Sequence, residues 1–212
     1  MKVLKEKYNK QLIGTLPRAQ FEGRIIVILN ELDAEKAVDY LLSQNMIGID
    51  TETRPSFKRG ISHSVALLQV ASDDTCFLFR LNRMGITESI KKLLEDNSVP
   101  KIGLSLHDDI RALSKRCKFT PGTFIEIQKE VKELGIQDMS LQKIYANIFG
   151  LKIAKNQQLS NWEADCLSEA QKVYAATDAW ACIQIHKEIT KLKDNKEYIL
   201  ELTEQELDNS PE

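Results

Sequence analysis

Closely spaced cysteines are missing from this sequence. It has four cysteines in 212 residues, and the two nearest, Cys166 and Cys182, are 16 residues apart (182 minus 166). Zinc sites and thiol redox motifs use pairs of cysteines separated by only a few residues. We therefore expect reduced, mostly buried thiols and no zinc or redox centre built from such pairs.

A large excess of charge of either sign is also absent. Lysine and arginine total 29 against 31 acidic residues, so the net charge is -2 and the pI is near 6.0. A protein that coats a long duplex needs a broad basic surface. If nucleic acid is the partner, the contact should be local, as in an enzyme that grips a few nucleotides at a strand end.

Long apolar runs are the third absence. The opening residues MKVLKEKYNKQLIG contain lysines but neither a continuous apolar segment nor a small-residue cleavage site. No other segment has the length and apolar character of a membrane helix, which needs about 20 such residues. We expect a cytoplasmic protein with no membrane partner, and the sequence leaves the oligomeric state open.

The composition that remains is that of a soluble globular domain, with 42% hydrophobic and 28% charged residues. No internal repeat or glycine-serine linker divides the chain. We expect a loosely attached lysine-rich arm at residues 1–22, because Gly14 and Pro17 would interrupt a helix there. A catalytic domain should span residues 23–192, followed by an acidic tail at 193–212.

Hydrophobic patterning predicts an α/β fold. Apolar runs with strand character occur at residues 24–29, 46–52, 64–71, 75–81, 100–103 and 123–127, and helical spacing occurs at 33–42, 87–94, 106–117, 141–149 and 168–192. The strands at 46–52, 64–71 and 75–81 follow one another through short links, which indicates an antiparallel meander. The later alternation of strands and helices favours a mixed sheet flanked by helices.

Two acidic residues end one of these apolar runs. Side chains two positions apart on a strand point to the same face, so Asp50 and Glu52 should project together. Burying two like charges side by side is unfavourable unless a cation neutralises them. A divalent metal would do so, although a pair at a solvated strand end is the commoner situation for such a short motif.

A third acid lies on the predicted helix at 106–117. Asp109 shares a helix side with apolar Leu106 and Leu113, so it should lean toward the core. Its neighbour Asp108 is three residues after Ser105, a spacing typical of helix capping. His107 should be solvated.

The last candidates are Tyr174 and Asp178, which lie four residues apart and therefore share a helix face. Alanines at positions 175, 176, 179 and 181 keep this helix slim, so it can approach the sheet closely. That approach would bring Asp178 within metal-bridging distance of the strand that carries Asp50. A core tyrosine with an outward aspartate is the plainer alternative.

The motifs IGIDTET, KIGLSLHDDIRAL and YAATDAWA occur in an order that resembles the tyrosine-bearing branch of the DEDD superfamily of 3′–5′ exonucleases. Werner-type exonuclease domains are the nearer relatives and ribonuclease D the more distant one. The resemblance covers residues 24–192 and implies a ribonuclease H-like mixed sheet of five or six strands flanked by helices.

The resemblance also implies a site and a mechanism. It implies two Mg²⁺ or Mn²⁺ ions held by Asp50, Glu52, Asp109 and Asp178, water positioned by Tyr174, and release of nucleoside 5′-monophosphates from a nucleic-acid 3′ end. DNA is the expected substrate. Thr51, Arg54, Lys155 and Trp162 are the candidate substrate-binding residues, with Lys155 first because the resemblance places a lysine there. Solvated surface charge is the plainer alternative for Arg54, and packing in the core is the commoner situation for Trp162.

Three other functions stay open at this point. A ribonuclease D-like enzyme would use the same metals on RNA and differ in how its groove treats the 2′-hydroxyl. A catalytically inactive nucleic-acid-binding module is possible because a fold does not fix a function. An enzyme acting on dinucleotides would depend little on oligonucleotide length.

Overall fold

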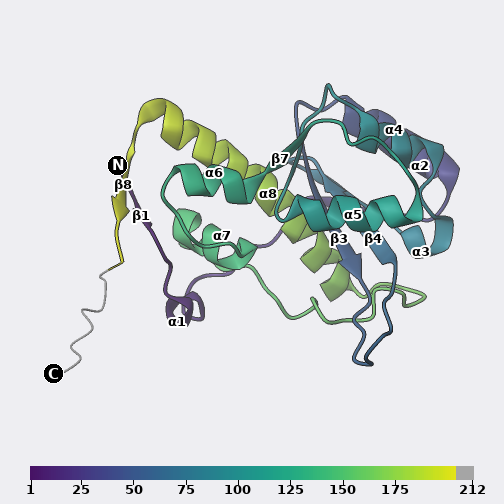
Figure 1. Ribbon diagram of the computed structural model, residues 1–212, viewed down its shortest axis with the longest axis horizontal. Coiled ribbons are helices and arrows are strands. Elements are labelled where there is room, and N and C mark those ends of the chain that lie inside the picture. Colours follow the sequence, from purple (N-terminus) through teal and green to yellow (C-terminus); the bar gives the residue numbers. More distant parts are fainter. Residues whose placement is uncertain (204–212) are drawn as a thin grey trace.

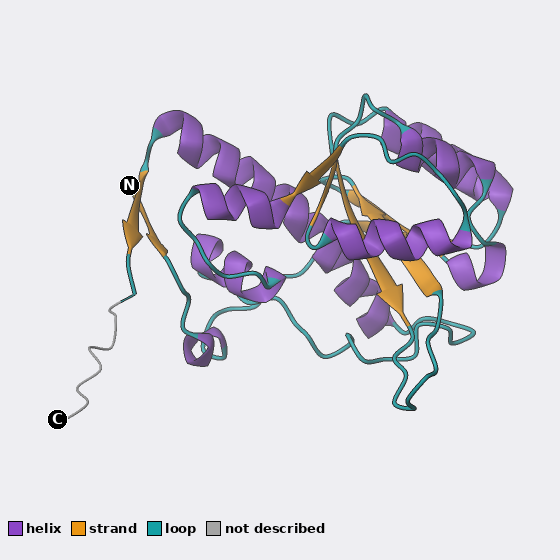
Figure 2. Ribbon diagram, viewed as in Figure 1, coloured by secondary structure: helices purple, strands orange, loops and turns teal. Residues whose placement is uncertain are grey.

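The apolar runs predicted as strands form one six-stranded sheet in the computed structural model, which describes residues 1–203 (Figures 1 and 2). Across the sheet the strands are β2 (Arg24–Ile28), β5 (Thr75–Phe79), β4 (Val65–Ala71), β3 (Ile47–Thr53), β6 (Lys101–Gly103) and β7 (Phe124–Glu126). The predicted meander is confirmed, because β4 pairs antiparallel with both β3 and β5. The other pairings, β2 with β5, β3 with β6 and β6 with β7, are parallel, so the sheet is mixed as expected.

Helices cover both faces of this sheet, as Figure 2 shows. One face packs against α2 (Glu31–Leu42), α3 (Leu81–Met84), α4 (Glu88–Glu95) and α5 (Leu106–Arg116). The other face is covered mainly by the long helix α8 (Glu169–Asn195). Next to α8 lie α6 (Ile127–Glu133) and α7 (Leu141–Phe149). A strand covered on both faces needs no alternation of polar and apolar residues, which explains why all seven residues of β4, VALLQVA, are buried.

Helix α8 begins with a capping box, in which Ser168 and Gln171 each bind the other's backbone amide. Further along α8, small residues let the helix lie directly on β3. A Cβ atom added to Gly48 would lie 1.9 Å from the backbone oxygen of Ala179. The close approach expected from the alanines is therefore present, and it lies beside Asp50 and Asp178.

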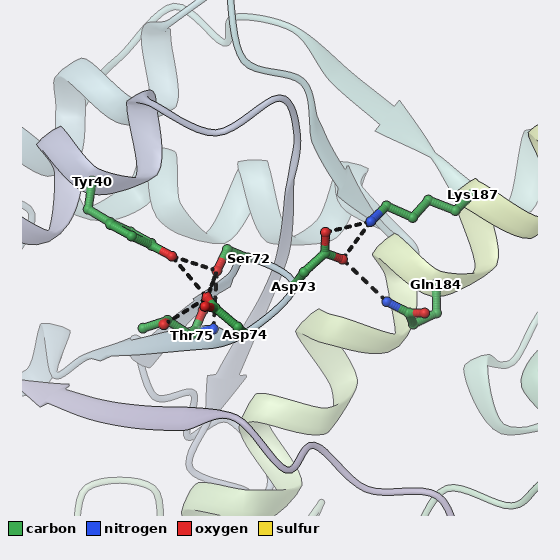
Figure 3. Close-up of polar contacts among 7 residues, drawn as sticks. All are labelled: Tyr40, Ser72, Asp73, Asp74, Thr75, Gln184 and Lys187. Atoms are coloured by element: carbon green, nitrogen blue, oxygen red, sulfur yellow. Dashed lines mark hydrogen bonds and ion pairs between the residues drawn. The ribbon is translucent and has the colours of Figure 1, made fainter.

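The tight turn between β4 and β5 makes polar contacts with both α2 and α8 (Figure 3). Within the turn, the Asp74 carboxylate accepts hydrogen bonds from Tyr40 and Thr75, which hold the pKa of Asp74 below its usual value. The neighbouring Asp73 carboxylate lies 2.6 Å from the Lys187 ammonium on α8. The turn therefore links α2, the sheet and the helix that carries Asp178.

The amino-terminal residues do not form the loosely attached arm expected from the sequence. Strand β1 (Lys2–Lys5) pairs in parallel with β8 (Tyr198–Glu201), and the short helix α1 (Lys10–Ile13) follows it. Leu4 is fully buried, and the Asn147 carboxamide on α7 binds both the amide and the carbonyl of Lys5. The arm packs because apolar residues between its lysines reach the cluster formed by α6, α7 and α8.

The proposed tail at 193–212 lies partly outside the described residues. Its first residues complete α8 and form β8, and residues 204–212 are beyond the described part. The boundaries of the three predicted segments stay predictions. Among residues 1–203, no helix has both the length and the hydropathy needed to cross a membrane.

Candidate active site

Three carboxylates from two elements meet on the α8 face of the sheet. Asp50 and Glu52 project from β3 to the same side, and Asp178 faces them from α8. One carboxylate oxygen of each residue lies within 4.8 Å of those of the other two. Because oxygen ligands suit hard divalent cations, this group could hold a metal ion.

Burial and mutual repulsion make the charged state of this group unfavourable. Burial raises the pKa of Glu52 to about 9, and the nearby Asp178 and Asp109 raise it in the same direction. Burial also raises the pKa of Asp50 well above its usual value, with repulsion from Asp109, Asp178 and Glu52 added to it. Groups held in this way gain from a bound cation, which offsets both effects.

Asp109 lies beside this group rather than in it. It is on the first turns of α5, where the Thr51 hydroxyl of β3 donates a hydrogen bond to its carboxylate. Burial raises the pKa of Asp109 to about 6, although the bond from Thr51 acts in the opposite direction. The helix side predicted for Asp109 is correct, and Thr51 connects it to the strand of Asp50 and Glu52.

The first turn of α5 is held by a residue that sequence reasoning missed. Ser105 is the N-cap but makes no capping hydrogen bond through its side chain, and its φ of 59° is left-handed. Instead, the Glu126 carboxylate at the end of β7 accepts hydrogen bonds from the amides of Ser105 and Leu106. The expected capping arrangement of Ser105 with Asp108 is therefore wrong, because the Glu126 carboxylate, distant in sequence, binds the Ser105 amide that Asp108 was expected to bind. Asp108 and His107 are exposed, the latter as expected.

Tyr174 lies one helical turn before Asp178 and is largely buried. Burial raises the pKa of its phenol, and the neighbouring Asp178 carboxylate raises it further. In return, the Tyr174 hydroxyl lowers the pKa of Asp178, which burial nevertheless holds at about 7. The hydroxyl therefore stays protonated over the physiological range of pH.

Trp162 packs on the inner side of Tyr174, with ring centroids 6.0 Å apart. The structure contradicts the prediction that Trp162 contacts the substrate, because its side chain has no exposed surface. It supports the tyrosine from behind instead. The sequence pattern around a tryptophan is the same whether the side chain lines a substrate channel or packs in the core beside it.

A pocket of about 370 Å³ opens onto the three carboxylates. Lys155 lies on its wall and lowers the pKa of Asp178, so its ammonium is near that carboxylate. Thr51 and Tyr174 also line it. The remaining wall comes mainly from residues that sequence reasoning missed, at the start of α7 and in the segment after it: Met139, Ser140, Leu141, Gln142, Ile153, Ala154 and Gln158. Their residue types carry no chemical signal, so no pattern in the sequence identifies them.

Arg54 lies outside the residues that line this pocket. Its guanidinium is 3.2 Å from the Glu163 carboxylate, and His63 approaches the same carboxylate at 3.6 Å. The predicted contact of Arg54 with substrate stays a prediction.

A buried glutamine of β4, Gln69, also lies next to the carboxylates. Gln69 of β4 is the cross-strand partner of Asp50, so both side chains lie on the α8 face. Gln69 is fully buried, and within residues 1–203 neither end of its carboxamide has a hydrogen-bond partner.

Comparison with known proteins places this geometry in a family. A family model described as 3′–5′ exonuclease matches residues 25–194. The bifunctional 3′–5′ exonuclease/ATP-dependent helicase WRN of Mus musculus is 29% identical over 193 residues, which are 86% of this chain and 14% of the relative. A 3′–5′ exonuclease of Arabidopsis thaliana is 27% identical over 84% of this chain and 67% of its own length. The chain thus spans about a seventh of the first relative and two thirds of the second.

Solved structures agree on the fold. The EXO domain of Aedes aegypti Nibbler superposes with a TM-score of 0.76 at 19% identity, over 85% of this chain and 94% of that one. Escherichia coli RNase D, described as an exoribonuclease involved in structured RNA processing, gives 0.72 at 19% identity, over 82% and 46%. With its sheet, its carboxylates and a family match over most of its length, this chain belongs to the 3′–5′ exonuclease family.

Proposed function

We propose that this chain hydrolyses the terminal phosphodiester bond at the 3′ end of nucleic acid, with DNA as the expected substrate, and releases nucleoside 5′-monophosphates. The observation that carries the proposal is the meeting of Asp50, Glu52 and Asp178 at the wall of one pocket. Family membership supports the direction of digestion.

Two Mg²⁺ or Mn²⁺ ions are the cofactors that fit these residues. The donors are carboxylate oxygens, and their raised pKa values reflect burial and repulsion that divalent cations offset. Asp50, Glu52 and Asp178 would hold one ion, and Asp109 would contribute to the second. Bound here, such ions lower the pKa of water and stabilise the charge that develops on the phosphate.

The chain's own residues supply orientation. The Tyr174 hydroxyl stays protonated beside Asp178, so it can donate a hydrogen bond that orients water next to the carboxylates. The Lys155 ammonium on the pocket wall attracts the phosphate of the terminal nucleotide. Both groups act without a covalent enzyme intermediate.

RNA is the second candidate substrate. RNase D of Escherichia coli, with the same fold, is described as an exoribonuclease, whereas the mouse relative combines its exonuclease with a helicase. An inactive binding module is less well supported, because all four acids and Tyr174 are present and Thr51 already links Asp109 to the site.

The test is digestion of single-stranded DNA, 3′-recessed duplex DNA and matched RNA, each labelled at the 5′ end, with Mg²⁺, Mn²⁺ or EDTA. We expect a metal-dependent ladder that shortens from the 3′ end, with DNA cut faster than RNA. If RNA is digested faster than DNA, RNA is the preferred substrate and the expectation of DNA is wrong. Intact substrates under every condition, with binding retained, would favour the inactive module.

A further inference from the structure

The loop between β3 and β4, residues 54–64, exposes two apolar side chains beside several cations. Phe57 is 85% exposed and Ile61 is 51% exposed. The chain turns tightly from Lys58 to Ile61. The amide of Ile61 donates to the carbonyl of Lys58 at 3.3 Å, and Gly60 has φ +81°, as such a turn requires. Lys58 and Arg59 are exposed at the same turn.

This loop is tied to the candidate active site from both of its ends. Its first residue, Arg54, and the histidine near its end, His63, both approach Glu163. Glu163 follows Trp162, which packs on Tyr174. In Figure 1 the loop extends past the ends of β3 and β4, beside the segment that precedes α8. The base of the loop therefore contacts the segment that carries Trp162, the residue that packs on Tyr174.

The distance suits a nucleic-acid strand that enters the pocket. Phe57 is five residues after Glu52, so its Cα lies at most about 17 Å from that of Glu52. A stacked strand rises about 3.4 Å per nucleotide, so this distance corresponds to about five nucleotides or fewer. A strand whose 3′ end lies at the carboxylates can pass the loop within its last few nucleotides.

The chemistry of the loop matches that strand. A single exposed apolar residue needs no explanation. Here, however, the exposed Phe57 ring lies four residues from the exposed Ile61 and directly precedes two exposed cations. Proteins that hold single strands combine aromatic rings, on which bases stack, with cations that follow the phosphates.

We propose that Phe57 and Ile61, with Lys58 and Arg59, form a stacking platform for bases a few nucleotides from the 3′ end of the substrate. The proposal rests on the proposed function, because it places the 3′ end at Asp50. In this proposal the pocket binds the terminal nucleotide, and the loop binds the nucleotides that precede it.

The test measures binding of fluorescent single-stranded DNA of about 12 nucleotides in an Asp50→Asn background, in which hydrolysis does not consume the ligand. Phe57→Ala is compared with Leu32→Ala, since Leu32 is 62% exposed on α2 and makes a matched control. Loss of one base stack should weaken binding by about 5- to 150-fold. Leu32→Ala should not change it.

Two further readouts separate stacking from a general effect. Phe57→Trp should retain binding, and the fluorescence of its added indole should be quenched by the oligonucleotide. In the catalytically competent chain, the rise in KM caused by Phe57→Ala should shrink as the substrate is shortened toward a dinucleotide, because a short substrate does not reach the loop.

The outcomes distinguish this proposal from the proposed function. Equal affinities of Phe57→Ala and Leu32→Ala, for a strand that the unmodified chain digests, would overturn the platform and leave the exonuclease intact. Binding that depends on Phe57 without any digestion would support the platform and overturn the exonuclease. Absence of both binding and digestion would overturn both, and would point to a protein partner for the exposed ring.

Discussion

Gly48 of β3 lies against the backbone carbonyl of Ala179 in α8, so closely that a Cβ at position 48 would be 1.9 Å from that oxygen. Gly48 is two residues before Asp50, and Ala179 follows Asp178. The contact therefore sets the separation between the strand and the helix that carry the facing carboxylates.

Gly48→Ala should lower both stability and activity. The methyl group has backbone in its path, so α8 must move away from β3, at a cost of about 1–3 kcal/mol. For a chain of this size, that corresponds to a fall in Tm of about 2–12 °C. Gly14→Ala is the matched control, because its nearest neighbour would be 3.9 Å from the added methyl group. Equal Tm values for the two variants, measured by calorimetry, would show that the close contact is not limiting.

The predictable part of the site is the part that short-range geometry controls. The same-face rule for a strand placed Asp50 and Glu52 together, and helical spacing placed Tyr174 above Asp178. The alanines of α8 indicated its close approach to the sheet. Each of these inferences needed only a few neighbouring residues.

The parts that could not be predicted depend on contacts between distant segments. Glu126 binds the amides at the start of α5, although it is 21 residues from Ser105. The pairing of β1 with β8 joins the two ends of the described chain, and neither strand has a pattern that names its partner. Trp162 was misplaced for a similar reason, since only the packing shows which side of Tyr174 it occupies.

The metal-free protein should lose stability as pH rises. The folded state holds the pKa of Glu52 at about 9 and that of Asp178 at about 7, whereas unfolded carboxyls titrate near 4. Between these values the folded state binds more protons, so the free energy of unfolding falls with increasing pH. We expect the Tm of EDTA-treated protein to decrease from about pH 5 to about pH 9.

Metal should remove much of this slope. Because the cations bind the deprotonated carboxylates, the rise in Tm on adding Mn²⁺ should grow with pH over the same interval. Asp50→Asn, which removes one of the repelling groups, should flatten the metal-free slope and reduce the effect of Mn²⁺. A metal-free Tm that rises over this interval would contradict the burial of charged carboxylates at this site.

Two buried glutamines should respond in opposite directions to replacement by leucine. Gln69 has no hydrogen-bond partner in the described residues, so Gln69→Leu should leave stability unchanged or raise it by about 1 kcal/mol or more. Gln171 donates to Ser160 and accepts from the Ser168 amide, so Gln171→Leu should cost about 1–3 kcal/mol. Chemical denaturation measures both. A loss of stability in Gln69→Leu as large as that in Gln171→Leu would contradict the contrast.

Lys155→Ala should reduce kcat/KM on oligonucleotides by about 10- to 100-fold, since the variant lacks a cation beside Asp178 and the phosphate. The same change should raise the pKa of Asp178. Because metal binds the deprotonated carboxylate, the variant should need a higher pH to bind metal. Lys155→Arg keeps the charge and should retain more activity. Lys36→Ala, which removes an exposed lysine of α2, serves as the control and should match the unmodified chain.

The most direct test of the central claim is identification of the first product released from a 3′-labelled strand, with Mn²⁺ or EDTA, by the unmodified chain and by Asp50→Asn. We predict a nucleoside 5′-monophosphate that forms only with metal, at a rate more than about 100-fold lower in the variant. A product with a 3′-phosphate, or equal release by Asp50→Asn, would contradict the assignment of the buried carboxylates as the centre of a 3′–5′ exonuclease.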